Sequence, residues 1–143
     1  MPSLSGQIRR ATPADWPHIW EIRLGVNENQ LTNLDAVTDE DVAWFTEHPG
    51  IWLWEEAGQV LGFSAADTRD GSVWALFIDP AHHGRGIGRA LFAKACEVLR
   101  GAGHRTATLS TGPGTRAERF YRAAGWKVIG TSLRGEVIFH GVL

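Results

Sequence analysis

The sequence reads Ile78-Asp79-Pro80-Ala81-His82-His83-Gly84-Arg85-Gly86-Ile87-Gly88-Arg89 where an apolar segment stops at a proline and an amphipathic helix is expected to follow. Glycines in such a turn let backbone N–H groups converge, with no Cβ to hold a ligand away. The helix that begins there adds unpaired amides and the positive end of its dipole. These features favour a site for a phosphate group, and pyrophosphate in particular. Arg85 and Arg89 are expected to add positive charge at its rim.

The spacing of the glycines excludes two common phosphate-binding motifs. The dinucleotide fingerprint Gly-x-Gly-x-x-Gly needs a third glycine at position 89 or 91, and these positions hold Arg89 and Leu91. A triphosphate loop needs Gly-x-x-x-x-Gly-Lys followed by Ser or Thr, and the chain contains no such string. The remaining pattern is His83-Gly84-Arg85-Gly86-Ile87-Gly88.

This pattern follows Leu76-Phe77-Ile78-Asp79-Pro80 and resembles the cofactor loop of the GNAT superfamily of acyl-CoA-dependent N-acetyltransferases. The family loop reads Gln/Arg-x-x-Gly-x-Gly/Ala, and His83 stands where Gln or Arg is usual. The resemblance implies that backbone amides of the loop bind the pyrophosphate of coenzyme A, and that the pantetheine arm lies along the preceding strand. The residues expected to bind the cofactor are Leu76, Phe77 and Ile78 on the strand, and His83, Gly84, Arg85, Gly86, Ile87, Gly88 and Arg89 in the loop.

A second match lies downstream, where Phe120-Tyr121 is followed by Gly125-Trp126. In the same superfamily the helix after the fifth strand carries Phe-Tyr-x-x-x-Gly-Phe/Trp. Gly125 can take the left-handed conformation that ends a helix. The resemblance implies that Tyr121, the only tyrosine of the chain, is the catalytic acid that protonates the departing thiolate. A phenol has a reference pKa of about 10 and a thiol one of about 8.5, so this proton transfer is nearly balanced.

One position departs from the family pattern. Many members carry an Asn about seven residues before the tyrosine, where it holds the cofactor; here that residue is Gly114. Thr111 or backbone groups of the Gly-Pro-Gly turn at 112–114 are alternatives for this contact, and the contact can also be absent.

The catalytic base and the acceptor pocket follow less directly from the sequence. An amine is protonated near neutral pH, so a base must take its proton before it attacks. Glu28 is the first candidate, because the loop that contains it covers the acceptor site in the family; Glu21, Asp67 and a water chain that ends at one of them are alternatives. Residues expected to line the acceptor pocket are Asn27, Trp54 and Trp74, the tryptophans as an aromatic wall for a cationic or planar amine or, alternatively, as core residues.

Composition indicates a single domain over residues 1–143, which is near the commonest domain size. A net charge of −2 does not favour binding to nucleic acid or to an anionic membrane. The adjacent His82 and His83 point apart and no third ligand is evident, so no metal site is expected. The N-terminal segment lacks a secretory pattern, which predicts a cytoplasmic protein. A homodimer is possible, because dimers are common in the superfamily.

The expected fold class is α/β (α+β), with a GNAT-like mixed, mostly antiparallel sheet of about six to seven strands and about four helices, splayed between strands four and five. Strands are expected at 7–10, 51–55, 60–66, 72–78, 105–110, 127–130 and 136–140. Helices are expected after Thr12, Thr38 and Gly86 and over 115–124.

The function that the resemblance implies is transfer of an acetyl group from acetyl-CoA to a primary amine of a small molecule, by direct attack in a ternary complex. One alternative is a module that binds acyl-CoA without turning it over. The other is acetylation of a protein or peptide amine.

Overall fold

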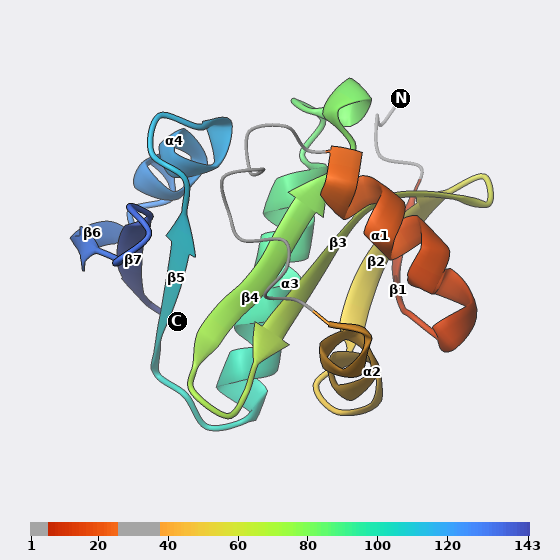
Figure 1. Cartoon of the computed structure of the whole chain (residues 1–143), viewed down its shortest axis with the longest axis horizontal. Coiled ribbons are helices and arrows are strands. Elements are labelled where there is room, and N and C mark those ends of the chain that lie inside the picture. The colour runs from red at the N-terminus through yellow and green to blue at the C-terminus, as the bar shows by residue number, and fades with distance from the viewer. Residues whose placement is uncertain (1–5, 26–37) are drawn as a thin grey trace.

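Seven strands form one sheet in the order β1-β2-β3-β4-β5-β7-β6 in the computed structural model, which describes residues 6–25 and 38–143 (Figure 1). The strands are β1 Gln7–Arg10, β2 Ile51–Glu56, β3 Gln59–Asp67, β4 Ser72–Ile78, β5 Thr106–Thr111, β6 Lys127–Thr131 and β7 Val137–Val142. The α-helices are α1 Trp16–Gly25, α2 Asp39–Glu47, α3 Ile87–Gly101 and α4 Arg116–Ala123. Short 3-10 turns η1 Pro13–Asp15 and η4 Pro80–His82 precede α1 and the glycine loop.

The expected mixed sheet is confirmed, since every neighbouring pair is antiparallel except β4 and β5, which are parallel. The parallel pair is connected through α3. The strands β1 and β4 have the expected bounds, and the bounds of the other strands differ from the expected ones by at most two residues. Glu136, for example, precedes β7, because its backbone N–H donates to the Ser132 hydroxyl and its carbonyl accepts from the Ser132 N–H, which closes a turn.

Helices cover both faces of the sheet. Figure 1 shows α1 and α2 on the near side and α3 on the far side. Alternation along β2 explains this arrangement, because Ile51 and Leu53 pack in the core under α1 and α2 while Trp54 packs in the core under α3. Helix α3 buries Leu91, Ala95 and Leu99 at a spacing of four residues, as expected for an amphipathic helix.

A β-bulge interrupts β4 at Trp74. Ala65 of β3 is opposite Ala75, but the next residue, Ala66, is opposite Val73, so Trp74 is the additional residue. The bulge turns Trp74 and Ala75 to the same face, where both pack in the core under α1 and α2. A regular strand would have placed Trp74 on the α3 face.

The sheet is splayed between β4 and β5. Only Ser72 and Thr108 are paired along these two strands, and the strands diverge toward their carboxyl ends at the top of Figure 1. The edge of β4 that faces β5 therefore presents backbone groups without a strand partner over most of its length. A crevice outside the carboxyl ends of parallel strands is a common ligand position in open α/β sheets.

An ion-pair network fixes the start of α1 against the sheet. Arg9 of β1 donates to both carboxylate oxygens of Asp15, at 2.8 and 3.0 Å, and to both of Glu55, at 3.1 Å each. The guanidinium of Arg9 lowers the pKa of Asp15 to about 2, so the carboxylate is charged at neutral pH. Because Asp15 immediately precedes α1, this network fixes where the helix lies over the sheet. Across the described residues, no helix is both long and apolar enough to cross a membrane.

Candidate functional site

Two clefts meet in the gap between β4 and β5. The first, the loop cleft, has a volume of about 470 Å³ and lies among the end of β4, the glycine loop and α4. The second, the sheet cleft, has a volume of about 420 Å³ and lies among β4, β5, α1 and the β6–β7 turn. The residues common to both clefts are Leu76, Phe77, Ala117 and Tyr121. A ligand in one cleft can therefore contact a ligand in the other at these residues.

The glycine loop has the backbone conformation expected of an anion cradle. Gly84 and Gly86 have φ angles of +81° and +84°, a region that L side chains rarely adopt. Gly86 is the N-cap of α3, so the amides of the first turn, Ile87, Gly88 and Arg89, have no acceptor within the helix. The Asp79 carboxylate accepts from the Ala81 N–H at 3.0 Å and closes the turn that precedes the loop. The residues of the first turn of α3, Ile87, Gly88 and Arg89, line the loop cleft, and their N–H groups suit a phosphate group.

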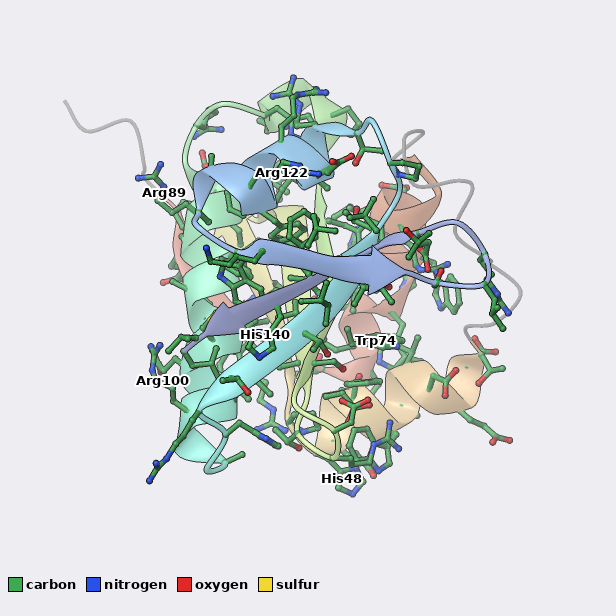
Figure 2. The ribbon with its side chains drawn as sticks, turned by 90° about the vertical axis from the view of Figure 1, so that its left-hand side faces the viewer. His48, Trp74, Arg89, Arg100, Arg122 and His140 are labelled. Atoms are coloured by element: carbon green, nitrogen blue, oxygen red, sulfur yellow. The ribbon has the colours of Figure 1, made fainter. Side chains whose placement is uncertain are left out.

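The charged residues that line the loop cleft are cationic. Arg89 comes from α3, and Arg116 and Arg119 come from the first turn and a half of α4; none of the described lining residues is Asp or Glu. Figure 2 shows α4 across the upper end of α3, where Arg89 is labelled. Sequence reasoning missed Arg116 and Arg119. The available signal was their spacing of three residues at the start of the helix that also carries Tyr121, which places both side chains on one face of that helix.

The expected role of the Arg85 side chain is corrected by its contacts. Its guanidinium donates to the Glu56 carboxylate at 2.7 and 2.9 Å, and Glu56 also accepts from the Trp54 indole N–H at 2.8 Å. The charge of Arg85 is thus compensated by β2 and is not presented at the rim of the loop. His83, Gly84, Gly86, Ile87, Gly88 and Arg89, in contrast, all line the loop cleft, as do Leu76, Phe77 and Ile78.

Tyr121 lies at the junction of the two clefts. Its side chain is 5% exposed, and its ring lies 5.4 Å from Phe92, 5.3 Å from Phe120 and 5.7 Å from Phe139, measured between centroids. Burial in this apolar cluster raises the pKa of the phenol, because the charged phenolate would be poorly solvated. Tyr121 therefore keeps its proton throughout the physiological pH range, although the raised pKa makes the phenol a weaker acid than its reference value suggests.

The two tryptophans expected at the acceptor pocket have different positions. Trp74 lines the sheet cleft and stacks on Phe45 with 3.9 Å between ring centroids. Figure 2 shows Trp74 near α2, away from α4. Trp54 is 5% exposed, lies in the core under α3 and lines neither cleft, so the structure does not bring it to the sheet cleft. The reason is the alternation of β2, which turns Trp54 away from the face that bears the cleft.

Two of the carboxylates considered as catalytic base, Glu21 and Asp67, do not line the sheet cleft. Glu21 is on the exposed side of α1, and Asp67, paired with Arg69 at 2.9 Å, is at the end of β3; neither lines the cleft. Glu28, like Asn27, lies outside the described residues. Within residues 6–25 and 38–143, the carboxylate that lines the sheet cleft is that of Glu136, which accepts from the Ser110 hydroxyl at 3.4 Å. Sequence reasoning missed Glu136, because it assigned this residue to a strand.

Gly114 lines neither cleft. Its φ angle is +74°, and its N–H donates to the Glu118 carboxylate at 2.7 Å, in a turn that begins α4. Thr111 is buried and lines the sheet cleft, so it does not take the position of the missing asparagine beside the loop.

The family model that describes the acetyltransferase (GNAT) family matches residues 8–126. The chain belongs to this family. A solved GCN5-related N-acetyltransferase from Kribbella flavida superposes with a TM-score of 0.77 and 26% identity, covering 97% of this chain and 98% of that one. The structure of yncA from Salmonella typhimurium with its cofactor acetyl-CoA superposes with a TM-score of 0.68 and 22% identity, covering 97% of this chain and 93% of that one. The expected GNAT fold is thus confirmed.

Curated relatives of this GNAT protein are named mycothiol acetyltransferase. The one from Amycolatopsis mediterranei is 35% identical over 89 residues, which is 54% of this chain and 29% of the relative. The chain spans about a third of the length of the curated relatives it matches.

Proposed function

We propose that this protein transfers an acetyl group from acetyl-CoA to a primary amine of a small molecule, with both substrates bound at once. The observation that carries the proposal is Tyr121, which lines both the cationic loop cleft and the separate sheet cleft. A proton donor at this junction suits direct transfer between two ligands. The names of the curated relatives favour acetyl transfer over binding alone.

The residues of the loop cleft fit coenzyme A. Gly84 and Gly86 have positive φ angles and no side chains, so nothing at these two positions fills the cradle. The first backbone amides of α3 suit the pyrophosphate of coenzyme A. Arg89, Arg116 and Arg119 supply compensating positive charge. The open edge of β4 at Leu76–Ile78 offers backbone donors and acceptors to the amide groups of pantetheine. Bound acetyl-CoA supplies the acetyl group in the activated form of a thioester.

The sheet cleft suits a small acceptor. Its volume of about 420 Å³ has room for a molecule of amino-acid size. Its walls combine apolar side chains from α1, α2 and β3 with the polar groups of the β6–β7 turn.

Two residues of this chain handle protons in the proposed reaction. Glu136, on the β5–β7 side of the sheet cleft, accepts the proton of the ammonium group directly or through a water molecule, so that the amine becomes nucleophilic. Tyr121 holds its proton at the phenol oxygen and donates it to the thiolate that leaves.

A thiol-release assay tests the function. Acetyl-CoA is expected to release coenzyme A in the presence of some members of a panel of small primary amines, and slowly without an amine. Stabilisation by acetyl-CoA in a thermal unfolding experiment, without release by any amine or peptide, would indicate a binding module instead. Release with peptide amines but none of the small amines would assign the alternative acceptor class.

Replacement of Glu136 by Gln is expected to lower kcat about 100-fold at pH 7, since a positioned general base contributes roughly 10²–10⁴ in rate. The deficit should shrink as the pH rises toward the pKa of the acceptor, because the free amine then forms without help. The measurement is kcat for wild type and variant between pH 6.5 and 10, values chosen to span amine deprotonation at about pH 9–10.

The matched control is Glu21→Gln, which removes an exposed carboxylate that lines neither cleft and should leave kcat unchanged. Equal rates for wild type and Glu136→Gln at pH 7 would exclude Glu136 as the base.

A further inference from the structure

Arg23 of α1 is a buried cation in the wall of the sheet cleft. Arg23 is 7% exposed. Its Nη1 atom is buried and has no hydrogen-bond partner among the residues that the structure describes. Burial lowers the pKa of the guanidinium, but arginine remains charged at neutral pH. A buried charge without a partner is unfavourable. The mechanism above does not use Arg23.

The rings around Arg23 do not replace an anion. The guanidinium carbon lies 6.0 Å from the Trp20 ring centroid and 5.9 Å from that of Phe77. These distances are at the limit of about 6 Å at which a cation is attracted to an aromatic face. Trp20 and Arg23 both line the sheet cleft and are three residues apart, so one side of α1 faces the cleft. The unsatisfied N–H groups are thus beside the space that the acceptor would occupy.

We infer that Arg23 binds a carboxylate of the acceptor, so that the substrate is a small amino acid with a free primary amine. This inference rests on the proposed function, because it names the substrate class of the same site. A carboxylate matches the planar fork of a guanidinium and can accept two parallel hydrogen bonds. Phe77, next to Arg23, also lines the loop cleft, so a carboxylate at Arg23 leaves an amine a few bonds away near the junction.

A phosphate of coenzyme A is another anion that a cation of this protein could bind. Arg23 does not line the loop cleft, where Arg89, Arg116 and Arg119 already provide positive charge. The position of Arg23 therefore favours an anion of the acceptor over a phosphate of coenzyme A. Ile19, Val42 and Phe63 form the adjoining wall, which favours an amino acid with an apolar side chain.

The test compares amino acids with their amides, which keep the amine and lose the negative charge. Phenylalanine, leucine and alanine are assayed beside phenylalaninamide, leucinamide and alaninamide, with wild type and with Arg23→Gln. The ratio of kcat/KM for acid over amide is expected to fall on the order of 10- to 100-fold in Arg23→Gln, the usual effect of losing hydrogen bonds to a charged group. Because each ratio is taken within one protein, the different reactivity of the two amines cancels. KM for acetyl-CoA should not change.

Controls separate binding from folding and from net charge. Arg105→Gln removes the same charge from an exposed position of the chain and should leave the ratio unchanged. Arg23→Lys retains the charge but loses the fork, so its ratio should lie between those of wild type and Arg23→Gln. In thermal unfolding, Arg23→Gln should be no less stable than wild type, because the variant removes a buried charge whose Nη1 atom has no hydrogen-bond partner among the described residues.

Calorimetry with N-acetylphenylalanine and N-acetylphenylalaninamide provides a second measurement that needs no turnover. Wild type is expected to bind the acid more tightly than the amide, and Arg23→Gln to lose this difference. Turnover of amides with an unchanged ratio in Arg23→Gln would overturn the role of Arg23 while leaving the acetyltransferase proposal intact. Equal binding of the acid and the amide by wild type would also overturn it. An absence of turnover with every amine, together with the expected calorimetric difference, would overturn the acetyltransferase proposal alone.

Discussion

Tyr121→Phe is expected to lower kcat by about 100-fold, with less than a twofold change in the affinity for acetyl-CoA. General acid catalysis by a positioned side chain contributes roughly 10²–10⁴ in rate, and the substitution removes only the hydroxyl group. The ring keeps its contacts with Phe92, Phe120 and Phe139, so the cluster under α4 stays packed. The measurement combines steady-state thiol release with direct titration of acetyl-CoA.

Loss of packing must be separated from loss of the proton. Phe139→Leu disturbs the ring that contacts Tyr121 from β7 and should lower the free energy of unfolding by about 1 kcal/mol, with only a small effect on kcat. Tyr121→Phe should show the opposite result, with nearly unchanged unfolding and a large loss of turnover. Unchanged turnover in Tyr121→Phe would remove Tyr121 as the acid.

Gly86→Val is expected to weaken acetyl-CoA binding by about 100-fold, or roughly 3 kcal/mol. Gly86 has a φ angle of +84° and is the N-cap of α3, and a β-branched residue cannot adopt this conformation without strain. The loop must then change its path, and the amides that border the loop cleft no longer converge. Isothermal titration with acetyl-CoA and with coenzyme A measures the loss.

Gly103→Val is the matched control for backbone strain. Gly103 follows α3 at its other end with a φ angle of +97°, and an added Cβ there would meet no atom within 4 Å. Both variants should lose about 1–2 kcal/mol of stability, because both force an L side chain into the left-handed region. Only Gly86→Val should lose affinity for acetyl-CoA. Equal affinities for the two variants would show that the loop conformation does not determine binding.

Local patterns in the sequence predicted most of the fold correctly. The capping residues Thr38 and Thr115 start α2 and α4, because their hydroxyls accept a backbone N–H within the following turn. The glycine loop and the Tyr121 motif were also recognisable, since each depends on a few residues close together in the chain. Side-chain direction was harder to predict. The bulge at Trp74 reverses the face of the sheet to which this side chain points, and the sequence of Ser72–Ile78 does not predict the bulge.

The sheet cleft could not be assembled from the sequence, because its walls come from segments far apart in the chain. Arg23 and Glu136 are separated by more than a hundred residues and both line the cleft, from α1 and from the β6–β7 turn. Arg85 illustrates the opposite error. From the sequence, the guanidinium of Arg85 was expected to add positive charge beside the loop, but it pairs with the Glu56 carboxylate of β2.

The sequence by itself determined the loop from Pro80 to Arg89, because glycine spacing and a helix start depend on local backbone conformation. It therefore predicted a site for the pyrophosphate of a donor. Only the tertiary structure decided which side chains line that site and which charges are paired elsewhere, as Arg85 is with Glu56. Arg116 and Arg119 reach the loop cleft, and the Arg23 Nη1 atom lies at the sheet cleft without a hydrogen-bond partner among the described residues, because β4 and β5 separate after a single pair of residues. The packing of distant segments around that gap, which no local pattern encodes, determines the acceptor side.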